Sequence, residues 1–191
     1  MARVGLFGGT FNPVHNGHLV LAQEAMQHAR LHELLFVPNA TPSHKRTAAL
    51  LPASLRLELL RLAIAGIAGA SIDEQELLRG GVSYSIDTVR ELNAKRPDAD
   101  LHFIIGSDSL AELHRWKDAE ELLQRTAFIV HPRSGFSGPW PVLERFPEAR
   151  VHFLQGPIVD ISSTLVRERL ARGQSLAGYV PESVAARLTV G

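Results

Sequence analysis

The 191-residue sequence contains no cysteine, which excludes disulfide bonds and thiolate metal sites and fits a reducing compartment. It has no apolar run long enough to span a membrane. It also lacks a signal peptide pattern, since the first residues already read as a strand. Lysine plus arginine and aspartate plus glutamate number 20 each, so the balanced charge gives no sign of a nucleic-acid-binding surface. We therefore expect a cytoplasmic protein that binds neither membrane nor nucleic acid.

The composition is that of a globular chain. Hydrophobic residues make up 45% and charged residues 21%, which is enough apolar material for a sizeable core. The sequence shows no linker, no internal repeat and no low-complexity segment. We therefore expect residues 1–191 to form a single domain. The sequence leaves open whether that domain is a monomer or a homo-oligomer.

Strand-like and helix-like segments alternate along the chain. Apolar runs bounded by turn residues predict strands at Val4–Phe7, Leu34–Pro38, Ser71–Ile72, Leu101–Ile105, Phe128–Val130 and Val151–Leu154. Apolar residues at helical spacing predict helices at His18–Ala29, Leu55–Ala68, Ser85–Lys95 and Ser163–Ala171, and Gly173 closes the last one. Asn39–Pro52 and Ser134–Pro141 are expected loops. This order predicts an α/β fold, a doubly wound (Rossmann-like) parallel sheet with helices on both faces and a small helical C-terminal part.

The first expected strand runs into Gly8-Gly9-Thr10, and His15 and His18 follow at the start of the next helix. Glycines let backbone N–H groups approach an anion, and a helix N-terminus adds oriented donors and partial positive charge. The pattern is neither GxGxxG nor a P-loop. It predicts a phosphate site, against the plainer interpretation of a tight turn with two surface histidines. A zinc site is a weaker interpretation, because no third ligand stands at a suitable spacing.

A second candidate anion site is the segment Ile161-Ser162-Ser163-Thr164-Leu165-Val166-Arg167. Successive hydroxyls open a helix there, and an arginine follows one turn later. Free N–H groups, hydroxyls and a guanidinium together can hold an anion. The simpler interpretation is an ordinary serine N-cap with a solvated arginine.

Polar residues follow the apolar strand Leu101–Ile105. Ligands of doubly wound sheets bind beyond the carboxyl ends of the strands, so Gly106 and Asp108 are candidates for contacting a ribose hydroxyl or a metal. The alternative for Asp108 is a helix cap. Trp116 is either a core side chain or a stacking surface for a flat ring.

Two further segments carry candidate ligand groups. The helix start Ser83-Tyr84-Ser85-Ile86-Asp87-Thr88 could hold a carboxylate on its backbone amides, although plain capping explains it as well. The run His44-Lys45-Arg46 lies in the expected loop, where it is either surface charge or a mobile cationic loop that closes on phosphates.

Taken together, these residues resemble the nucleotidyltransferase superfamily with the (H/T)xGH motif, here His15-Asn16-Gly17-His18, and with an ISSTxxR element, here Ile161 to Arg167. Within that superfamily the chain is similar to the bacterial nicotinate-nucleotide adenylyltransferases. The resemblance covers nearly the whole chain. Its pieces are, in order, GGTFNPVHNGHL, Pro42 to Lys45, Ser83-Tyr84-Ser85, Ile105-Gly106-Ser107-Asp108 with Trp116, and Tyr179-Val180-Pro181.

The resemblance implies that ATP and nicotinate mononucleotide react to give deamido-NAD (nicotinate adenine dinucleotide) and pyrophosphate, with Mg²⁺ accompanying ATP. It implies catalytic roles for His15, His18, Lys45 and Arg167. It implies ATP binding by Gly8, Gly9, Thr10, Phe11, Gly17, Gly106, Asp108, Ile161, Ser162, Ser163 and Thr164. It implies binding of nicotinate mononucleotide by His44, Lys45, Tyr84, Ser85, Ile86, Thr88 and Trp116, with Trp116 stacked on the pyridine ring. It implies no metal ligand from the protein itself.

One departure concerns the residues after the expected strand Phe128–Val130. The family often has a basic run such as Arg-Arg-Pro there, whereas this chain has His131-Pro132-Arg133. Two alternatives stay open. One is another adenylyltransferase of the superfamily, with phosphopantetheine or nicotinamide mononucleotide as acceptor. The other is a non-catalytic nucleotide-binding module.

Overall fold

The computed structural model describes residues 1–42, 50–133, 135, 138–157 and 159–189. Within these ranges the main sheet has six strands, all parallel, in the order β4-β2-β1-β6-β7-β8. The strands are β1 (Ala2–Gly9), β2 (Glu33–Pro38), β4 (Ala70–Ile72), β6 (Ala99–Gly106), β7 (Ala127–His131) and β8 (Val151–Phe153). Every strand expected from the sequence is present, and the predicted fold is confirmed.

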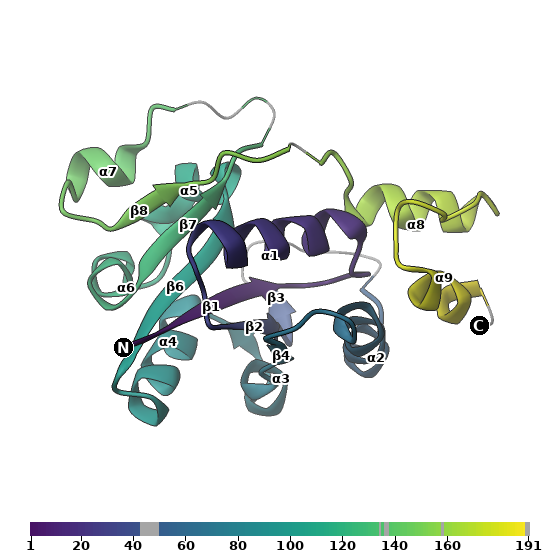
Figure 1. The fold of residues 1–191 in the computed structure, drawn as a ribbon, viewed down its shortest axis with the longest axis horizontal. Helices are drawn as coiled ribbons and strands as arrows, with labels where there is room; N and C mark the ends of the chain where they lie inside the picture. Colours follow the sequence, from purple (N-terminus) through teal and green to yellow (C-terminus); the bar gives the residue numbers. More distant parts are fainter. Residues whose placement is uncertain (43–49, 134, 136–137, 158, 190–191) are drawn as a thin grey trace.

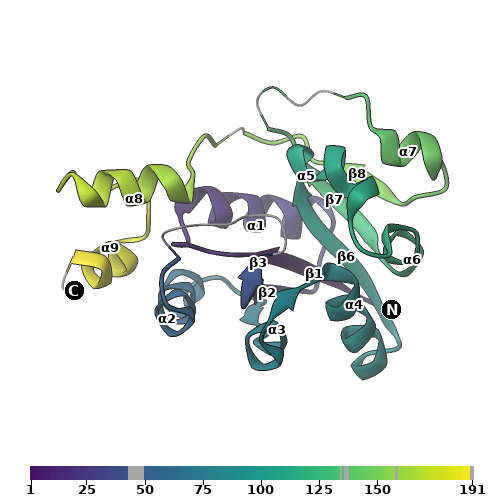
Figure 2. The same ribbon diagram turned by 180° about the vertical axis from the view of Figure 1, so that it is seen from behind.

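Helices cover both faces of the sheet, and in two opposite views α1 lies on one side of β1 while α3 and α4 lie on the other (Figure 1; Figure 2). The helices are α1 (Asn16–His28), α2 (Ala53–Ile64), α3 (Gln75–Arg79), α4 (Ser85–Lys95), α5 (Ser107–Glu112), α6 (Ala119–Arg125), α7 (Pro141–Arg145), α8 (Ser163–Ala171) and α9 (Glu182–Thr189), with a 3₁₀ turn η1 (Leu113–Arg115). None of the helices in the described ranges is long and apolar enough to cross a bilayer.

Alternation along the strands produces one apolar cluster on each face. In β1, Phe7 packs with α1, α2, α8 and α9, whereas Leu6 packs with α4, α5, α6 and α7. In β6, Ile104 and Phe103 divide in the same way. Neighbouring side chains of a strand point to opposite faces, so a strand covered on both sides must be apolar at nearly every position. This explains why the central strands read as continuous apolar runs.

The boundaries of three predicted segments are wrong. The helix predicted to reach Ala68 ends at Ile64, because the chain turns through Gly66 and Gly69, the latter at φ 78°, into β4. The loop predicted at Asn39–Pro52 contains a short strand β3 (Thr41–Pro42), which pairs in parallel with β5 (Val82–Ser83). Residues 43–49 of that loop lie outside the described residues. The loop predicted to reach Pro141 ends where α7 begins.

The C-terminal helices lie at the opposite end of the molecule from β8 and α7 (Figure 1). Val166 of α8 and Val184 of α9 are fully buried in the same cluster as Leu21 of α1, which confirms the predicted helical C-terminal part. Gly173 follows α8 at φ 64°, and its N–H donates to the carbonyl of Leu170, as expected for the residue that closes a helix.

The strand order determines where a ligand can enter. From β1 the chain moves outward to β2 and β4, returns to β6 beside β1, and then moves outward the other way to β7 and β8. The order therefore reverses between β1 and β6, and doubly wound sheets bind ligands at the carboxyl ends of the strands at such a point.

Candidate active site

Two adjoining cavities open at the carboxyl ends of β1 and β6. The larger, of about 320 Å³, extends from the Gly-Gly end of β1 to Trp116, and the smaller, of about 240 Å³, lies beside the start of α1. They share the lining residues His18, Leu21, Asp108 and Arg133, so they form one continuous site. Its position at the reversal of strand order is the one expected for a bound ligand.

Two histidines stand at the junction of these cavities, His15 lining the smaller one and His18 lining both. His15 is the N-cap residue of α1, and its ring stacks on the ring of His18 with centroids 3.6 Å apart. The backbone N–H of His15 donates to Nδ1 of His18 at 3.2 Å. Because Nδ1 accepts this bond, a neutral His18 carries its proton on Nε2. His18 can therefore donate from Nε2 without first being protonated.

His15 is nearly inaccessible, at 5% exposure, and its Nδ1 has no hydrogen-bond partner among the described residues. Burial, and then the positive charge of Arg133, lower the pKa of His15 from 6.5 to about 4. Desolvation disfavours the charged imidazolium. His15 is thus neutral near pH 7.

The segment 161–167 lies against the loop that precedes α1, although about 150 residues separate the two in sequence. Ser163 Oγ donates to the carbonyl of Pro13 at 2.9 Å, and Arg167 donates to the carbonyl of Asn12 at 2.7 Å. Ser162 caps α8 by accepting from the N–H of Leu165 at 3.1 Å. The structure therefore brings the two predicted phosphate motifs together. It also gives Ser162 the ordinary capping role that the sequence left as an alternative.

Arg167 is only partly available to a ligand. Besides Asn12, it donates to Thr164 Oγ1 at 3.2 Å, so part of its guanidinium is already committed to holding α8 on the loop. Ile161 lines the smaller cavity and Ser163 the larger one.

Gly17 explains how closely the two motifs can pack. A Cβ at this position would lie 3.0 Å from Nδ1 of His15 and 3.3 Å from the carbonyl oxygen of Ile161. The neighbouring Asn16 donates from its backbone to the carbonyl of Tyr179 at 2.8 Å and from its side chain to the carbonyl of Gly178 at 2.9 Å. The start of α1 is thus held from two later segments of the chain.

The end of β1 supplies the opposite wall. Gly8, Gly9, Thr10 and Phe11 all line the larger cavity. Phe11 has a left-handed backbone at φ 47° and is 1% exposed, with its ring 5.1 Å from that of His18. A non-glycine residue in this region is strained unless its surroundings fix it. The side chain of Phe11 therefore supports His18 from behind the cavity.

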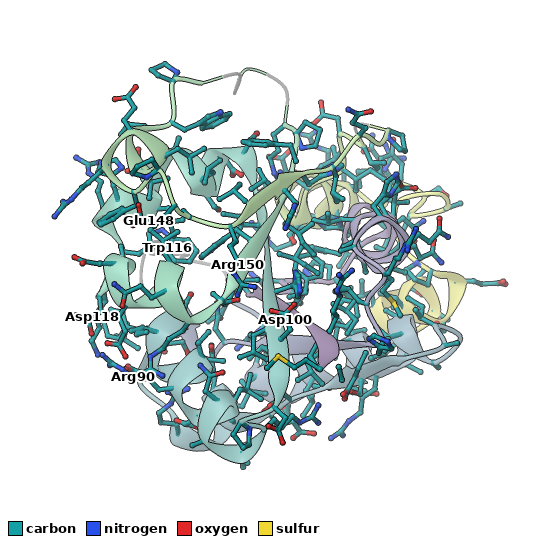
Figure 3. The ribbon with its side chains drawn as sticks, turned by 60° about the vertical axis from the view of Figure 1, so that its left-hand side comes forward. Arg90, Asp100, Trp116, Asp118, Glu148 and Arg150 are labelled. Atoms are coloured by element: carbon teal, nitrogen blue, oxygen red, sulfur yellow. The ribbon has the colours of Figure 1, made fainter. Side chains whose placement is uncertain are left out.

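At its far end, the larger cavity is lined by Ser83, Ser85 and Trp116. Trp116 packs edge-on against Phe103, with centroids 6.2 Å apart, and leaves part of its surface in the cavity. It also lines a neighbouring cavity of about 490 Å³, together with Arg90 and Asp118, which lie on the same side of the molecule (Figure 3). A flat aromatic wall of this kind can stack on a planar ring.

The helix start Tyr84 to Thr88 divides into residues that face the site and residues that do not. Ser85 lines the cavity, and Tyr84 is the N-cap residue of α4, with Lys117 Nζ 4.7 Å from the centre of its ring. Ile86 and Thr88 are buried, at 0% and 1% exposure. Of Ile86, only the backbone amide can serve as a donor at the helix start, because its side chain is apolar and buried. Thr88 acts from outside the cavity.

Glu76, which the sequence analysis missed, explains what Thr88 does. Its carboxylate is 6% exposed, lines the larger cavity and accepts a hydrogen bond from Thr88 Oγ1. Burial raises the pKa of Glu76, against hydrogen bonds from Thr88 and Ser83 that lower it. Glu76 therefore holds Ser83, which precedes α4, and Thr88, in its first turns, at a fixed separation. No local pattern marks it, because it stands in the charged run Asp73-Glu74-Gln75-Glu76.

Asp108 and Arg133 form an ion pair of 3.3 Å at the junction of the two cavities. Gly106 leaves room for the pair, since a Cβ there would lie 2.3 Å from Oδ1 of Asp108 and 2.7 Å from Nε of Arg133. The sequence offered ribose, metal or a backbone amide as the partner of Asp108, and the structure gives it a guanidinium. Arg133 lines both cavities, so the departure at His131-Pro132-Arg133 keeps a cation in the site.

The described residues include no group of three or more His, Cys, Asp or Glu side chains that could hold a metal ion. Of the predicted site residues, His44 and Lys45 lie outside the described residues. Most of the others line the two cavities. Six of them line neither cavity: Tyr84, Ile86, Thr88, Ser162, Thr164 and Arg167.

A family model and several curated relatives match nearly the whole of this chain. The cytidylyltransferase-like family model matches residues 6–169. A probable nicotinate-nucleotide adenylyltransferase of Gloeobacter violaceus is 45% identical over 191 residues, covering 95% of this chain and 91% of the relative. One of Geobacillus thermodenitrificans is 40% identical over 186 residues, covering 96% and 82%.

The fold is also found among solved structures. A nicotinic acid mononucleotide adenylyltransferase of Plasmodium falciparum, complexed with APC, superposes with a TM-score of 0.81 at 18% identity and covers 97% of this chain and 94% of its own. The same enzyme complexed with NaAD gives a TM-score of 0.79 at 19% identity, again covering 97% and 94%. At these identities the likeness shows the fold.

Proposed function

We propose how the two cavities carry out adenylyl transfer in this chain, which belongs to the cytidylyltransferase-like family and, within it, to the nicotinate-nucleotide adenylyltransferases. The enzyme transfers the AMP moiety of ATP to nicotinate mononucleotide, which gives deamido-NAD and pyrophosphate in NAD biosynthesis. The observation that carries the proposal for the site is the continuity of the two cavities through His18 and Arg133. A phosphate site and an acceptor site adjoin there.

The nucleophile of this reaction is a phosphate oxygen of the mononucleotide. It is already ionised near neutral pH, so the protein needs no strong base. Catalysis then depends on placing that oxygen in line with the leaving pyrophosphate and on stabilising charge at the α-phosphorus. The absence of an activated serine or cysteine pattern from the sequence agrees with this requirement.

We assign the stabilising role to His18, with His15 orienting it. Nε2 of His18 is a donor in the neutral ring, because Nδ1 is occupied by the N–H of His15. A donor fixed before the reaction costs no reorganisation when charge develops. Arg133 adds a positive charge at the junction of the cavities, and Arg167, with Ser163 and Thr164, supports the triphosphate from α8.

The remaining groups of the nucleotide side are Gly8, Gly9, Thr10, Gly17, Gly106, Asp108, Ile161 and Ser162. We propose that the glycines among them let the nucleotide approach the backbone closely, as the cavity beside β1 allows. Lys45 and His44 keep their expected roles as cations for the phosphates and the mononucleotide.

We propose that the acceptor's pyridine ring stacks on Trp116 and that its carboxylate accepts from the first amides of α4, at Ser85 and Ile86. A helix N-terminus carries unpaired N–H groups and a partial positive charge, which favour an acid over the uncharged amide. Glu76 fixes this helix start through Ser83 and Thr88.

A divalent metal accompanies ATP in this chemistry, and we propose Mg²⁺. We propose that this metal is carried by the phosphates of the nucleotide and by water. Mg²⁺ keeps several waters and is commonly bound through substrate phosphates. When bound, it would neutralise phosphate charge, while the chain's own residues orient the two substrates.

Two wider expectations remain proposals. Residues 1–191 act as one domain, which the shared core of α1, α8 and α9 supports. The enzyme works in the cytoplasm, as a monomer or a homo-oligomer.

The test is pyrophosphate release from ATP and Mg²⁺ with each of three acceptors: nicotinate mononucleotide, nicotinamide mononucleotide and phosphopantetheine. Release with the nicotinate acceptor, and a kcat/KM at least about fivefold higher for it than for the amide, is expected from a helix-terminus effect of about 1 kcal/mol or more. Faster turnover of nicotinamide mononucleotide or of phosphopantetheine would show that nicotinate mononucleotide is not the preferred acceptor. No release with any acceptor would favour the binding-module alternative.

A further inference from the structure

Arg56, in the first turns of α2, is an arginine in an unusual place. It is 1% exposed, which makes it the largest of the fully buried side chains that the structure describes. Burying a cation costs free energy unless its donors find partners. Burial lowers the pKa of Arg56 below its ordinary value, but a guanidinium stays protonated in proteins. The surroundings of Arg56 must therefore supply hydrogen-bond acceptors for a fully charged guanidinium.

The partners that satisfy it are backbone carbonyls from three separate segments. Nη1 donates to the carbonyl of Thr10 at 2.8 Å and to that of Asn39 at 2.9 Å. Nη2 donates to the carbonyl of Ala40 at 3.3 Å, and Nε to that of Leu51 at 3.2 Å. A guanidinium carries five N–H donors in a rigid plane, so one side chain can hold several carbonyls at fixed relative positions.

These carbonyls belong to both walls of the larger cavity. Thr10 continues the Gly-Gly end of β1, on the nucleotide side. Asn39 and Ala40 follow β2, and the N–H of Ala40 donates to Ser83 Oγ at 3.3 Å, on the acceptor side. A second link joins the walls, since Asn39 Nδ2 donates to Thr10 Oγ1 at 3.3 Å. Arg56 thus lies behind the cavity and bonds to the backbone of each wall.

We propose that Arg56 is a positioning residue that sets the separation between the nucleotide wall and the acceptor wall, and so holds the two substrates at reacting distance. This inference rests on the proposed function. An in-line displacement needs the reacting atoms about 3–3.5 Å apart, and a misplacement of about 1 Å costs roughly a hundredfold in rate. Arg56 touches no substrate, because the backbone of Thr10 and Asn39 stands between.

The test compares Arg56→Met, which keeps length and removes every donor, with Arg56→Lys, which keeps the charge but not the planar fork. The control is Arg61→Met on the same helix, where the side chain is 59% exposed and pairs with Glu74. For each variant, kcat and the KM of both substrates are measured below the melting temperature found by circular dichroism.

We expect Arg56→Met to lower kcat at least tenfold and to raise the KM of both substrates. Arg56→Lys should recover part of the kcat, and Arg61→Met should stay within twofold of the wild type. A purely structural role would lower the melting temperature and leave kcat unchanged in the folded protein, and that result would overturn the proposal. Failure of both Arg56 variants to fold would also overturn it, since Arg56 would then be a requirement of folding.

A failure of the proposed function can be told apart from a failure of the proposal for Arg56. If the wild type released no pyrophosphate, calorimetric titration would still compare the binding of a non-hydrolysable ATP analogue and of nicotinate mononucleotide. Weaker binding of both by Arg56→Met, by threefold or more, would support a role in holding the two walls. Equal binding by the wild type and both Arg56 variants would overturn it.

Discussion

The rings of His15 and His18 are stacked with centroids 3.6 Å apart and planes inclined by 28°, and the backbone of the first donates to the ring of the second. Neither ring can turn without disturbing the other. Residues in such contact do not contribute independently, so the double variant should cost less than the sum of the two single ones.

His18→Ala should lower kcat about a hundredfold or more, the scale of losing one fixed donor to a developing negative charge. The check is steady-state pyrophosphate release at saturating substrates. His28→Ala is the matched control, since His28 is the last residue of the same helix and its side chain is 46% exposed. A folded His18→Ala variant with the wild-type kcat would contradict the assignment.

His15 should make the protein less stable in acid. Its pKa is about 4 in the folded state, against 6.5 as the ordinary value, so between these limits the unfolded chain binds more protons. Stability must then rise with pH over this window and fall as the pH drops towards 4, by up to about 3 kcal/mol.

Urea unfolding of the wild type and of His15→Asn from pH 4 to pH 7 measures this contribution. The pKa of His131 is lowered as well, by burial and by Arg133, so the wild type carries both effects and only the difference between the curves belongs to His15. Parallel curves for the two proteins would show that His15 does not titrate in this way.

Gly17→Ala should separate the two phosphate motifs. The new Cβ would press on Nδ1 of His15 and on the carbonyl of Ile161, so one of these neighbours must shift by a few tenths of an ångström. We expect kcat/KM for ATP to fall about tenfold or more, because misplacement of this size is costly. Gly66→Ala is the control: a Cβ there meets nothing within 4 Å, and stability should change by less than about 1 kcal/mol.

Trp116→Ala should weaken the acceptor and leave ATP unaffected. Stacking of a base on an aromatic side chain contributes about 1–3 kcal/mol, which corresponds to a rise of roughly 5-fold to 150-fold in the KM of nicotinate mononucleotide. Trp140→Ala serves as comparison, since that ring packs on Phe153, 5.8 Å away. A rise in the KM of ATP alone would place the nucleotide, rather than the acceptor, on Trp116.

Local patterns were enough to predict the sheet and to mark the two segments, around His15 and around Ser163, that the structure brings together. The runs in β1 and β6 are apolar because both faces are covered, and the polar start of α8 precedes a regular helix. Short elements such as α3, α6 and the pairing of β3 with β5 escaped prediction. They have too few residues for a period to show, and their formation depends on packing.

The supporting residues of the site could not be predicted for a different reason. Arg56 stands in a leucine-rich helix, where an arginine normally faces solvent, and its partners at Thr10, Asn39 and Leu51 are far from it in sequence or belong to loops. Glu76 and Arg133 likewise gain their roles only from tertiary contacts. Sequence motifs marked the groups that would touch substrates and missed the groups that hold them.

The contacts that join the start of α1 to later segments have a consequence for synthesis. The carbonyl of Pro13 accepts a hydrogen bond from Ser163, and Asn16 donates to the carbonyls of Gly178 and Tyr179. The wall of the nucleotide site therefore includes residues some 150 positions later in the chain than the glycines and histidines it supports. We expect a nascent chain to complete this wall only after Tyr179 has been translated and has left the exit tunnel.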